Sequence, residues 1–170
     1  QQAMNVTRLF DLLDHVSEKY QKPDLLAGKE NGQWVKYSTQ QLVENSYNLA
    51  YGLIALGVNK GDTIALIANN RPEWNMADYG IQLAGAINVP IYPTISEHDL
   101  NFILKDAEVK YIFVSSPELY SRAKACSADV PSVKGIYSFN KIEGAKHWSE
   151  LLESGKKNPA KEKVETIKGS

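Results

Sequence analysis

From residue 60 onward, short apolar runs alternate with longer segments that are apolar on one face only. The run TIALIA is apolar at almost every position, which is typical of parallel strands buried on both faces. The segments between the runs carry apolar residues at helical spacing. Strands that alternate with helices predict right-handed βαβ units. We therefore expect an α/β fold, with a mostly parallel sheet of about four strands flanked by helices; the four runs are Thr63–Ala68, Ile87–Ile91, Val109–Val114 and Val133–Phe139.

Helix boundaries are marked by residues that cap helix ends. Ser38, followed three residues later by Gln41, predicts a capping box at the start of a helix that Gly57 ends. Ser96 is placed to cap a later helix, and Ser116-Pro117 puts a cap and a proline in the order preferred at a helix start. These positions predict where three of the helices begin.

The region before the parallel sheet has a different pattern. Apolar residues at helical spacing over Val6–Val16 predict an N-terminal helix. Two short runs follow, Asp24–Lys29 and Gln33–Tyr37, on either side of Asn31-Gly32. Asn-Gly favours a tight hairpin turn, so we expect a β-hairpin here.

The end of the sequence is more polar than the middle. Trp148–Leu152 predicts a short last helix that stops at Gly155. Residues 156–170 hold five lysines, two glutamates and few apolar side chains, a composition that favours a flexible tail or a cut linker. We therefore divide the chain into an α/β subdomain, residues 1–155, and a polar tail, residues 156–170.

Composition excludes several classes of protein. The chain has 170 residues and a net charge of −1, which argues against nucleic acid as the main partner. Its single cysteine, Cys126, excludes a disulfide framework and a zinc site made of several cysteines. No apolar run has the length of a membrane span, and no secretory signal is evident, so we expect a cytoplasmic protein.

A recognisable catalytic centre is not evident in the sequence. The glycines form neither a dinucleotide-binding fingerprint nor a phosphate-binding P-loop, and this disfavours a Rossmann-type oxidoreductase. The three histidines are scattered and have no metal-ligand spacing. We therefore predict no catalytic residue and no metal ligand within the chain.

Two segments follow strand ends, where open α/β sheets bind ligands. The segment NNRPEW ends at Trp74, whose large apolar face suits either a binding crevice or the core. The segment VPIYPT contains Tyr92, Pro93 and Thr94, and its two prolines make it stiff. A stiff segment suits the wall of a pocket and suits a plain connector equally well. These four residues are our candidates for a substrate crevice.

An ordered series of motifs resembles a known family. RPEW, AGAINVPIYPT, LNFILKDAE and VKYIFV follow one another from Arg71 to Val114, and GVNKGDTIALIANN precedes them. The series is similar to the N-terminal part of long-chain acyl-CoA synthetases, which belong to the adenylate-forming superfamily. The resemblance extends over about residues 6–140, and Tyr-Pro-Thr at 92–94 favours the long-chain branch.

The resemblance implies a parent enzyme with its own chemistry. Such a parent joins a fatty acid to ATP as an acyl-adenylate with release of pyrophosphate, then transfers the acyl group to CoA, and Mg²⁺ neutralises the phosphates. The phosphate loop, the adenine- and ribose-binding segments and the catalytic lysine of that family have no counterpart here. We therefore expect an N-terminal fragment that is inactive alone, holds no cofactor, and takes ATP, Mg²⁺ and CoA only within the parent.

Partners and alternatives follow from the same reasoning. The expected partners are the remainder of the same polypeptide and, in the parent, fatty acid, ATP and CoA. The fragment can also form a homodimer through an uncovered sheet edge or face. The resemblance allows peripheral association of the parent with the inner face of the membrane. Two alternatives stay open: another adenylate-forming carboxylate ligase, and a non-catalytic α/β interaction module.

Overall fold

The computed structural model is built around one parallel sheet, and it describes residues 26–30, 33–68 and 72–168. The sheet has the strand order β4-β3-β5-β6-β7, and each neighbouring pair is parallel. This confirms the predicted α/β fold with a parallel sheet. The strands are β3 (Thr63–Ile67), β4 (Ile87–Ile91), β5 (Tyr111–Val114), β6 (Gly135–Ser138) and β7 (Lys146–His147).

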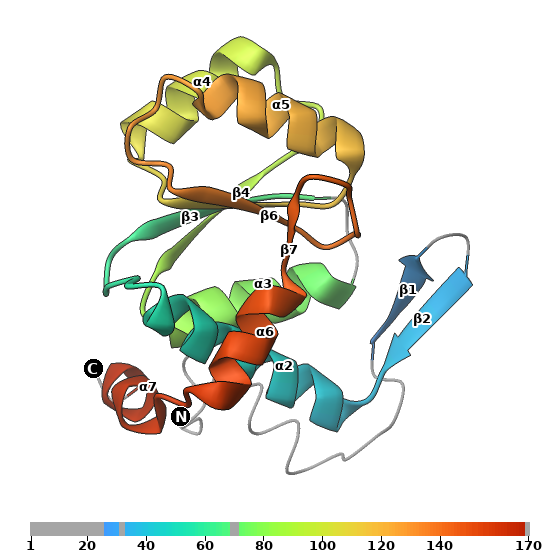
Figure 1. Cartoon of the computed structure of the whole chain (residues 1–170), viewed down its shortest axis with the longest axis vertical. Helices are drawn as coiled ribbons and strands as arrows, with labels where there is room; N and C mark the ends of the chain where they lie inside the picture. The colour runs from blue at the N-terminus through green and yellow to red at the C-terminus, as the bar shows by residue number, and fades with distance from the viewer. Residues whose placement is uncertain (1–25, 31–32, 69–71, 169–170) are drawn as a thin grey trace, which may run out of the picture.

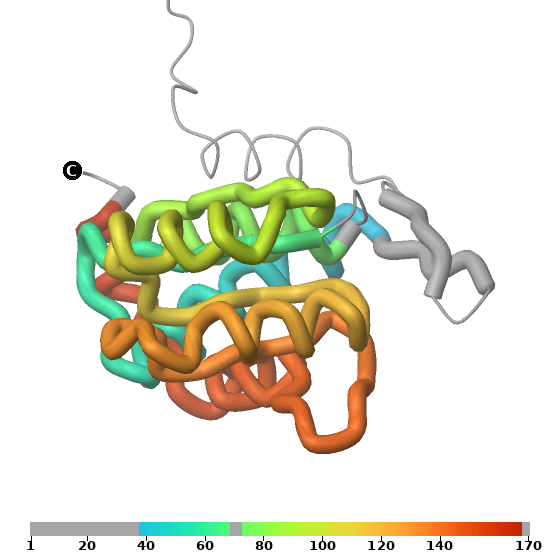
Figure 2. The backbone as a smooth tube through the Cα atoms, turned by 90° about the horizontal axis from the view of Figure 1, so that it is seen from above, coloured from blue at the N-terminus to red at the C-terminus, as the bar shows by residue number. Residues whose placement is uncertain are grey.

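Helices cover both faces of the sheet (Figures 1 and 2). In Figure 1, α4 and α5 lie above the sheet, while α3, α2 and α6 lie below it. This arrangement follows from the crossovers, because each helix between two parallel strands must pack on one face of the sheet. The helices are α2 (Thr39–Ala55), α3 (Pro72–Leu83), α4 (Glu97–Asp106), α5 (Pro117–Ser127) and α6 (Ser149–Lys157).

Strand β3 explains why an almost unbroken apolar run is needed at the centre. Ile64 and Leu66 belong to the core cluster shared with α2, α3 and α6. Ala65 and Ile67 belong to the second cluster, beneath α4 and α5. All four side chains are fully buried. Because successive side chains point to opposite faces, both sets must be apolar.

The capping predictions are confirmed. The Ser38 hydroxyl accepts from the Gln41 N–H, and the Gln41 side chain accepts from the Ser38 N–H, which completes a capping box on α2. The Ser96 and Ser116 hydroxyls accept from the Asp99 and Leu119 N–H groups and so cap α4 and α5. Gly57, just after α2, has φ +98°, a conformation that glycine adopts without steric cost. Local sequence therefore sets these helix ends.

The hairpin expected before the sheet is also present. Strands β1 (Leu26–Glu30) and β2 (Gln33–Tyr37) pair antiparallel, with Glu30 opposite Gln33. The two strands form a sheet of their own, to the right of the layered region in Figure 1. The helix expected over Val6–Val16 lies outside the described residues.

Two features near the end of the sheet differ from expectation. The sheet has a fifth strand, β7, whose two residues are too few to give a period-2 pattern. The prediction that Gly155 stops the last helix is wrong, because α6 continues to Lys157. Gly155 instead allows a close helix crossing, since a Cβ there would clash with the backbone carbonyl of Asn48 on α2.

A further helix, α7 (Lys161–Lys168), lies within the segment expected as a polar tail. Val164 on this helix is fully buried, and Ile167 lies against Gly85. Two apolar residues three positions apart are enough to give a short helix one contact face, which an average composition does not reveal. The division of the chain at residues 155 and 156 stays a prediction.

Strand β4 is the outermost strand on its side of the described sheet. The Ile87 N–H donates to the Asp62 carbonyl next to β3. Because alternate residues of a strand face the same neighbour, the N–H and C=O groups of Ile87, Val89 and Ile91 are directed toward β3. The peptide groups of Asn88 and Pro90 therefore face outward. Because proline has no N–H, the outer edge lacks a hydrogen-bond donor at residue 90.

Candidate functional site

A pocket of about 540 Å³ lies at the carboxyl ends of β3 and β4. Parallel sheets of this type bind ligands at the same end. The pocket is formed where the segment leaving β4 passes the first turn of α3. The described residues that line it are Ala68, Trp74, Asn75, Pro90, Ile91, Tyr92 and Pro93.

Trp74 both packs against the core and lines the pocket. It lies in the first turn of α3, where Pro72 favours the start of the helix. Its side chain is half-buried and packs against the core cluster below the sheet, and it also lines the pocket. One ring can do both because a tryptophan has a large apolar surface. The core holds this wall of the pocket in place.

Residues Tyr92 to Ile95 form a tight turn directly after β4. The Ile95 N–H donates to the Tyr92 carbonyl at 3.1 Å, and Pro93 occupies the second position of the turn, where its fixed φ is favourable. The Tyr92 side chain is 84% exposed. The rigid turn thus presents a large aromatic group at the mouth of the pocket.

The structure brings three of the four candidate residues together. Trp74, Tyr92 and Pro93 line one pocket, while Thr94 is exposed and is not among the lining residues. Asn75 was missed by the sequence reasoning, although it adjoins Trp74 on the same helix turn. None of the described lining residues carries a charge. Most of the described lining residues are apolar or aromatic, which suits contact with an apolar or aromatic group.

Arg122 on α5 was also missed, and it holds the turn from behind. Its guanidinium donates to the carbonyl oxygens of Pro93 at 2.8 Å and Ile95 at 3.2 Å. Arg122 and these two residues are 27 to 29 positions apart in the sequence, so no local sequence pattern could have indicated the contact.

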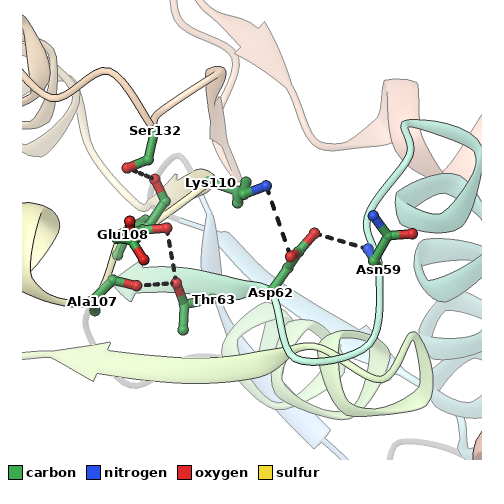
Figure 3. A network of polar contacts seen from close by, with 8 residues as sticks. Asn59, Asp62, Thr63, Ala107, Glu108, Lys110 and Ser132 are labelled. Atoms are coloured by element: carbon green, nitrogen blue, oxygen red, sulfur yellow. Dashed lines mark hydrogen bonds and ion pairs between the residues drawn. The ribbon is translucent and has the colours of Figure 1, made fainter.

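The opposite end of the sheet carries a second hollow, of about 420 Å³, within a polar network (Figure 3). The Thr63 hydroxyl donates to the carbonyls of Ala107 and Glu108 at the end of α4, at 2.6 and 3.1 Å. Asp62 accepts from the Asn59 N–H at 2.8 Å and lies 3.8 Å from the Lys110 ammonium group. These contacts satisfy turn and helix-end groups, so they have a structural explanation.

The single cysteine of the chain lies on α5. Cys126 is buried, and its thiol pKa is raised mainly by burial and further by the nearby Glu97 carboxylate. A raised pKa leaves little reactive thiolate near neutral pH. Within residues 26–30, 33–68 and 72–168, no group of three His, Cys, Asp or Glu side chains is placed to hold a metal ion.

None of the helices described here combines the length and the apolar composition needed to cross a bilayer.

A model of the family described as "AMP-binding enzyme" matches residues 14–168, which is most of the chain. The chain belongs to the AMP-binding enzyme family. Among similar AMP-binding relatives, the long-chain-fatty-acid–CoA ligase FadD15 of Mycobacterium bovis is 29% identical over 106 residues, which cover 62% of this chain and 18% of that protein. The long-chain-fatty-acid–CoA ligase ACSBG2 of Xenopus laevis is 27% identical over 156 residues, which cover 89% of this chain and 21% of that protein.

The fold of this member of the AMP-binding enzyme family is also found in solved structures. The crystal structure of the long-chain-fatty-acid-CoA ligase FadD1 from Archaeoglobus fulgidus gives a TM-score of 0.74 at 25% identity, and the match covers 86% of this chain and 29% of that one. The chain spans about a fifth of the length of the curated relatives reported above.

Proposed function

We propose that this chain is the N-terminal portion of a long-chain fatty acid–CoA ligase. The observation that carries the proposal is the match to the AMP-binding family over residues 14–168, together with relatives that are named long-chain-fatty-acid–CoA ligases. The parent reaction consumes fatty acid, ATP and CoA and yields acyl-CoA, AMP and pyrophosphate. The fatty acid carboxylate attacks the α-phosphorus of ATP and releases pyrophosphate. The CoA thiol then attacks the acyl carbon and releases AMP.

The 170 residues supply scaffold rather than reacting groups. The described residues include no cluster suited to Mg²⁺, and the pocket at the carboxyl end of β3 and β4 has no charged side chain among its described lining residues. We therefore assign ATP, Mg²⁺ and CoA to other parts of the parent polypeptide and propose that the chain is inactive alone. We propose that the protein is cytoplasmic and that the parent can associate peripherally with the inner face of the membrane.

Activity of the full-length protein tests this proposal. With palmitate, ATP, Mg²⁺ and CoA, the full-length protein should release AMP and pyrophosphate, and the 170-residue chain should release neither. A panel of short, long and aromatic carboxylates distinguishes a long-chain ligase from another adenylate-forming ligase. A full-length protein that turns over none of these acids would favour the interaction-module alternative.

Within the parent, Trp74, Tyr92, Pro93 and Thr94 form part of the substrate crevice in this proposal. Trp74 and Tyr92 provide apolar walls, while the Asn75 amide and the Tyr92 hydroxyl can orient a substrate by hydrogen bonds. Thr94 contributes through the turn rather than through the pocket lining. The support is the position of the pocket at the ligand-binding end of the sheet and its uncharged surface.

Replacement of Tyr92 tests the crevice in the full-length enzyme. Tyr92→Ala should raise KM for the acyl substrate about tenfold, because an aromatic contact worth roughly 1.5 kcal/mol or more is removed. Tyr92→Phe keeps the ring and isolates the hydroxyl, and Phe102→Ala, at an exposed aromatic residue on α4 outside the described pocket lining, serves as a control. Kinetics of Tyr92→Ala that are unchanged across acyl lengths would remove Tyr92 from the crevice.

A homodimer of the chain is a further arrangement within this proposal. Ile87 on the outer strand and Phe102 on α4 are both exposed, at 53% and 63%, and can supply apolar contacts. Sedimentation of the chain over a range of concentrations would detect such a dimer. Double replacement by Ile87→Ser and Phe102→Ser should abolish it.

A further inference from the structure

Arg122 is a mostly enclosed cation whose main contacts are backbone carbonyls. It lies on α5, and its side chain is 24% exposed. Its ion pair with Glu118, one helical turn earlier, is long at 3.8 Å, and the Glu118 side chain is 83% exposed. A pair of this kind contributes little, so the pair does not explain why the guanidinium is held inward.

The carbonyls that Arg122 binds belong to the turn beside the pocket. Within the turn, the Tyr92 carbonyl is already bonded to the Ile95 N–H. The carbonyls of Pro93 and Ile95 point the other way and accept from one guanidinium nitrogen of Arg122. The carbonyls of Tyr92, Pro93 and Ile95 therefore all have hydrogen-bond partners.

A second contact fixes the same segment one turn further along α5. The Cys126 sulfur lies 3.5 Å from the Glu97 carbonyl, at the start of α4. The segment between β4 and α4 is therefore held by α5 at two points. Arg122 is the point closer to the pocket, because Pro93 is itself a lining residue.

We propose that Arg122 is a positioning residue for the substrate crevice: it holds the turn at Tyr92–Ile95 from behind, and so fixes where the Tyr92 ring and Pro93 stand against the ligand. This inference rests on the proposed function of the pocket. Hydrogen bonds from a charged donor are about twice as strong as neutral ones, and the guanidinium offers several donors in fixed geometry. Lysine, with a single compact ammonium group, cannot reproduce that geometry.

The effect on catalysis follows from preorganisation. If the turn moves freely, substrate binding must order it, and the cost appears as weaker binding. Arg122 acts on the backbone carbonyls of the turn, so we expect its loss to affect binding rather than the chemical step. Loss of the guanidinium therefore raises KM for the substrate in the pocket and leaves kcat nearly unchanged.

Three variants of the full-length protein test the proposal. Arg122→Met removes every donor and keeps an apolar stem, Arg122→Lys keeps the charge, and Glu118→Gln removes the long ion pair as a control. Hydrogen exchange followed by mass spectrometry reports on residues 92–97 and, as an internal reference, on β5. Steady-state kinetics report KM and kcat.

Arg122→Met should speed exchange in residues 92–97 about tenfold, with β5 unchanged, and should raise KM about tenfold with kcat within about twofold. Arg122→Lys should lie between Met and Arg on both measures, and Glu118→Gln should match the unmodified protein. If Arg122→Met does not fold, Arg122→Lys decides the question on the same two measures.

Unchanged exchange in residues 92–97 overturns the proposal, and so does equal acceleration in β5, which would indicate general stabilisation only. Faster local exchange with unchanged KM also overturns it, because the turn would then not serve substrate binding. If the full-length protein is inactive with every carboxylate tested, the proposed function is wrong. The hydrogen-exchange result then still decides whether Arg122 holds the turn.

Discussion

The turn before β3 and the pocket after β3 lie at opposite ends of the strand and differ in how completely the polar side chains compared here are paired. At the amino end, Thr63 and Asp62 have partners at or below 3.1 Å within the chain. At the carboxyl end, the side chains of Asn75 and Tyr92 have no hydrogen-bond partner among the described residues, and Tyr92 is largely exposed. An end whose groups are satisfied internally serves the fold, whereas an end that leaves groups available can serve a ligand. The comparison predicts that changes at the amino end act on stability and changes at the carboxyl end act on binding.

The largest effect on stability should come from Thr63. Thr63→Val keeps the shape but removes the hydroxyl that bonds the Ala107 and Glu108 carbonyls. We expect the free energy of unfolding to fall by about 1–3 kcal/mol, because two carbonyls at the end of α4 lose their donor. Urea unfolding of the 170-residue chain measures this change.

Thr94→Val makes the same chemical change at the carboxyl end and is the matched control. Thr94 is exposed, so we expect its free energy of unfolding to change by less than about 0.5 kcal/mol. Equal losses for the two variants would erase the difference between the ends.

A smaller effect, of opposite sign, is expected at Glu108. This residue has φ +51°, in the left-handed region that costs an ordinary residue about 1–2 kcal/mol. Glu108→Gly relieves that cost but adds disorder to the unfolded chain, so we expect a net gain of up to about 1 kcal/mol in the free energy of unfolding. Glu108→Ala removes the carboxylate without relieving φ and should leave stability near its original value. A less stable glycine variant would show that the Glu108 side chain itself contributes to the network.

The sequence predicts the helices and strands better than it predicts the side-chain contacts of Thr63 at the amino end of the sheet. TIALIA and Ser116-Pro117 act locally, through alternation and capping, and both predictions are confirmed. The Thr63 contact with Ala107 joins residues 44 positions apart, and no periodicity encodes such a contact. The same reason hides Arg122 at the carboxyl end.

Gly155 illustrates a different limit of sequence-based prediction. Glycine near the end of a helical pattern favours a helix stop, yet here it permits two helix backbones to approach. Both causes select glycine, and only the position of α2 distinguishes them. The candidate pocket was predicted in part. Because open α/β sheets bind ligands at the carboxyl ends of their strands, the sequence indicated Trp74 and Tyr92 as neighbours of a pocket. The position of the Thr94 side chain depends on the turn at residues 92–95, which the sequence did not predict.

The smallest expected effect concerns pH at the amino end. Asp129 accepts hydrogen bonds from Lys105 and Asn101, at 2.8 Å each, and these bonds lower its carboxyl pKa, the Lys105 bond most. Because the folded pKa lies below the unfolded one, the contribution is present above the ordinary Asp pKa and is lost as pH falls through the folded value.

Comparison with Asp129→Asn measures this contribution. The urea midpoint of the unmodified chain should exceed that of the variant by a small amount near pH 7, and the difference should shrink below about pH 4. A difference that persists or grows in acid would assign the contact to something other than the charged carboxylate.

Pro90 has a consequence for the time when this polypeptide is still emerging from the ribosome. A parallel sheet with an uncovered outer strand is a template on which a second nascent molecule can polymerise. At residue 90 a carbonyl of a second strand finds no N–H group from which to accept a hydrogen bond. The hydrogen-bond ladder between the two strands is therefore interrupted there. The proline that lines the pocket thus also removes one backbone donor at which a second strand could add to the edge of the described sheet.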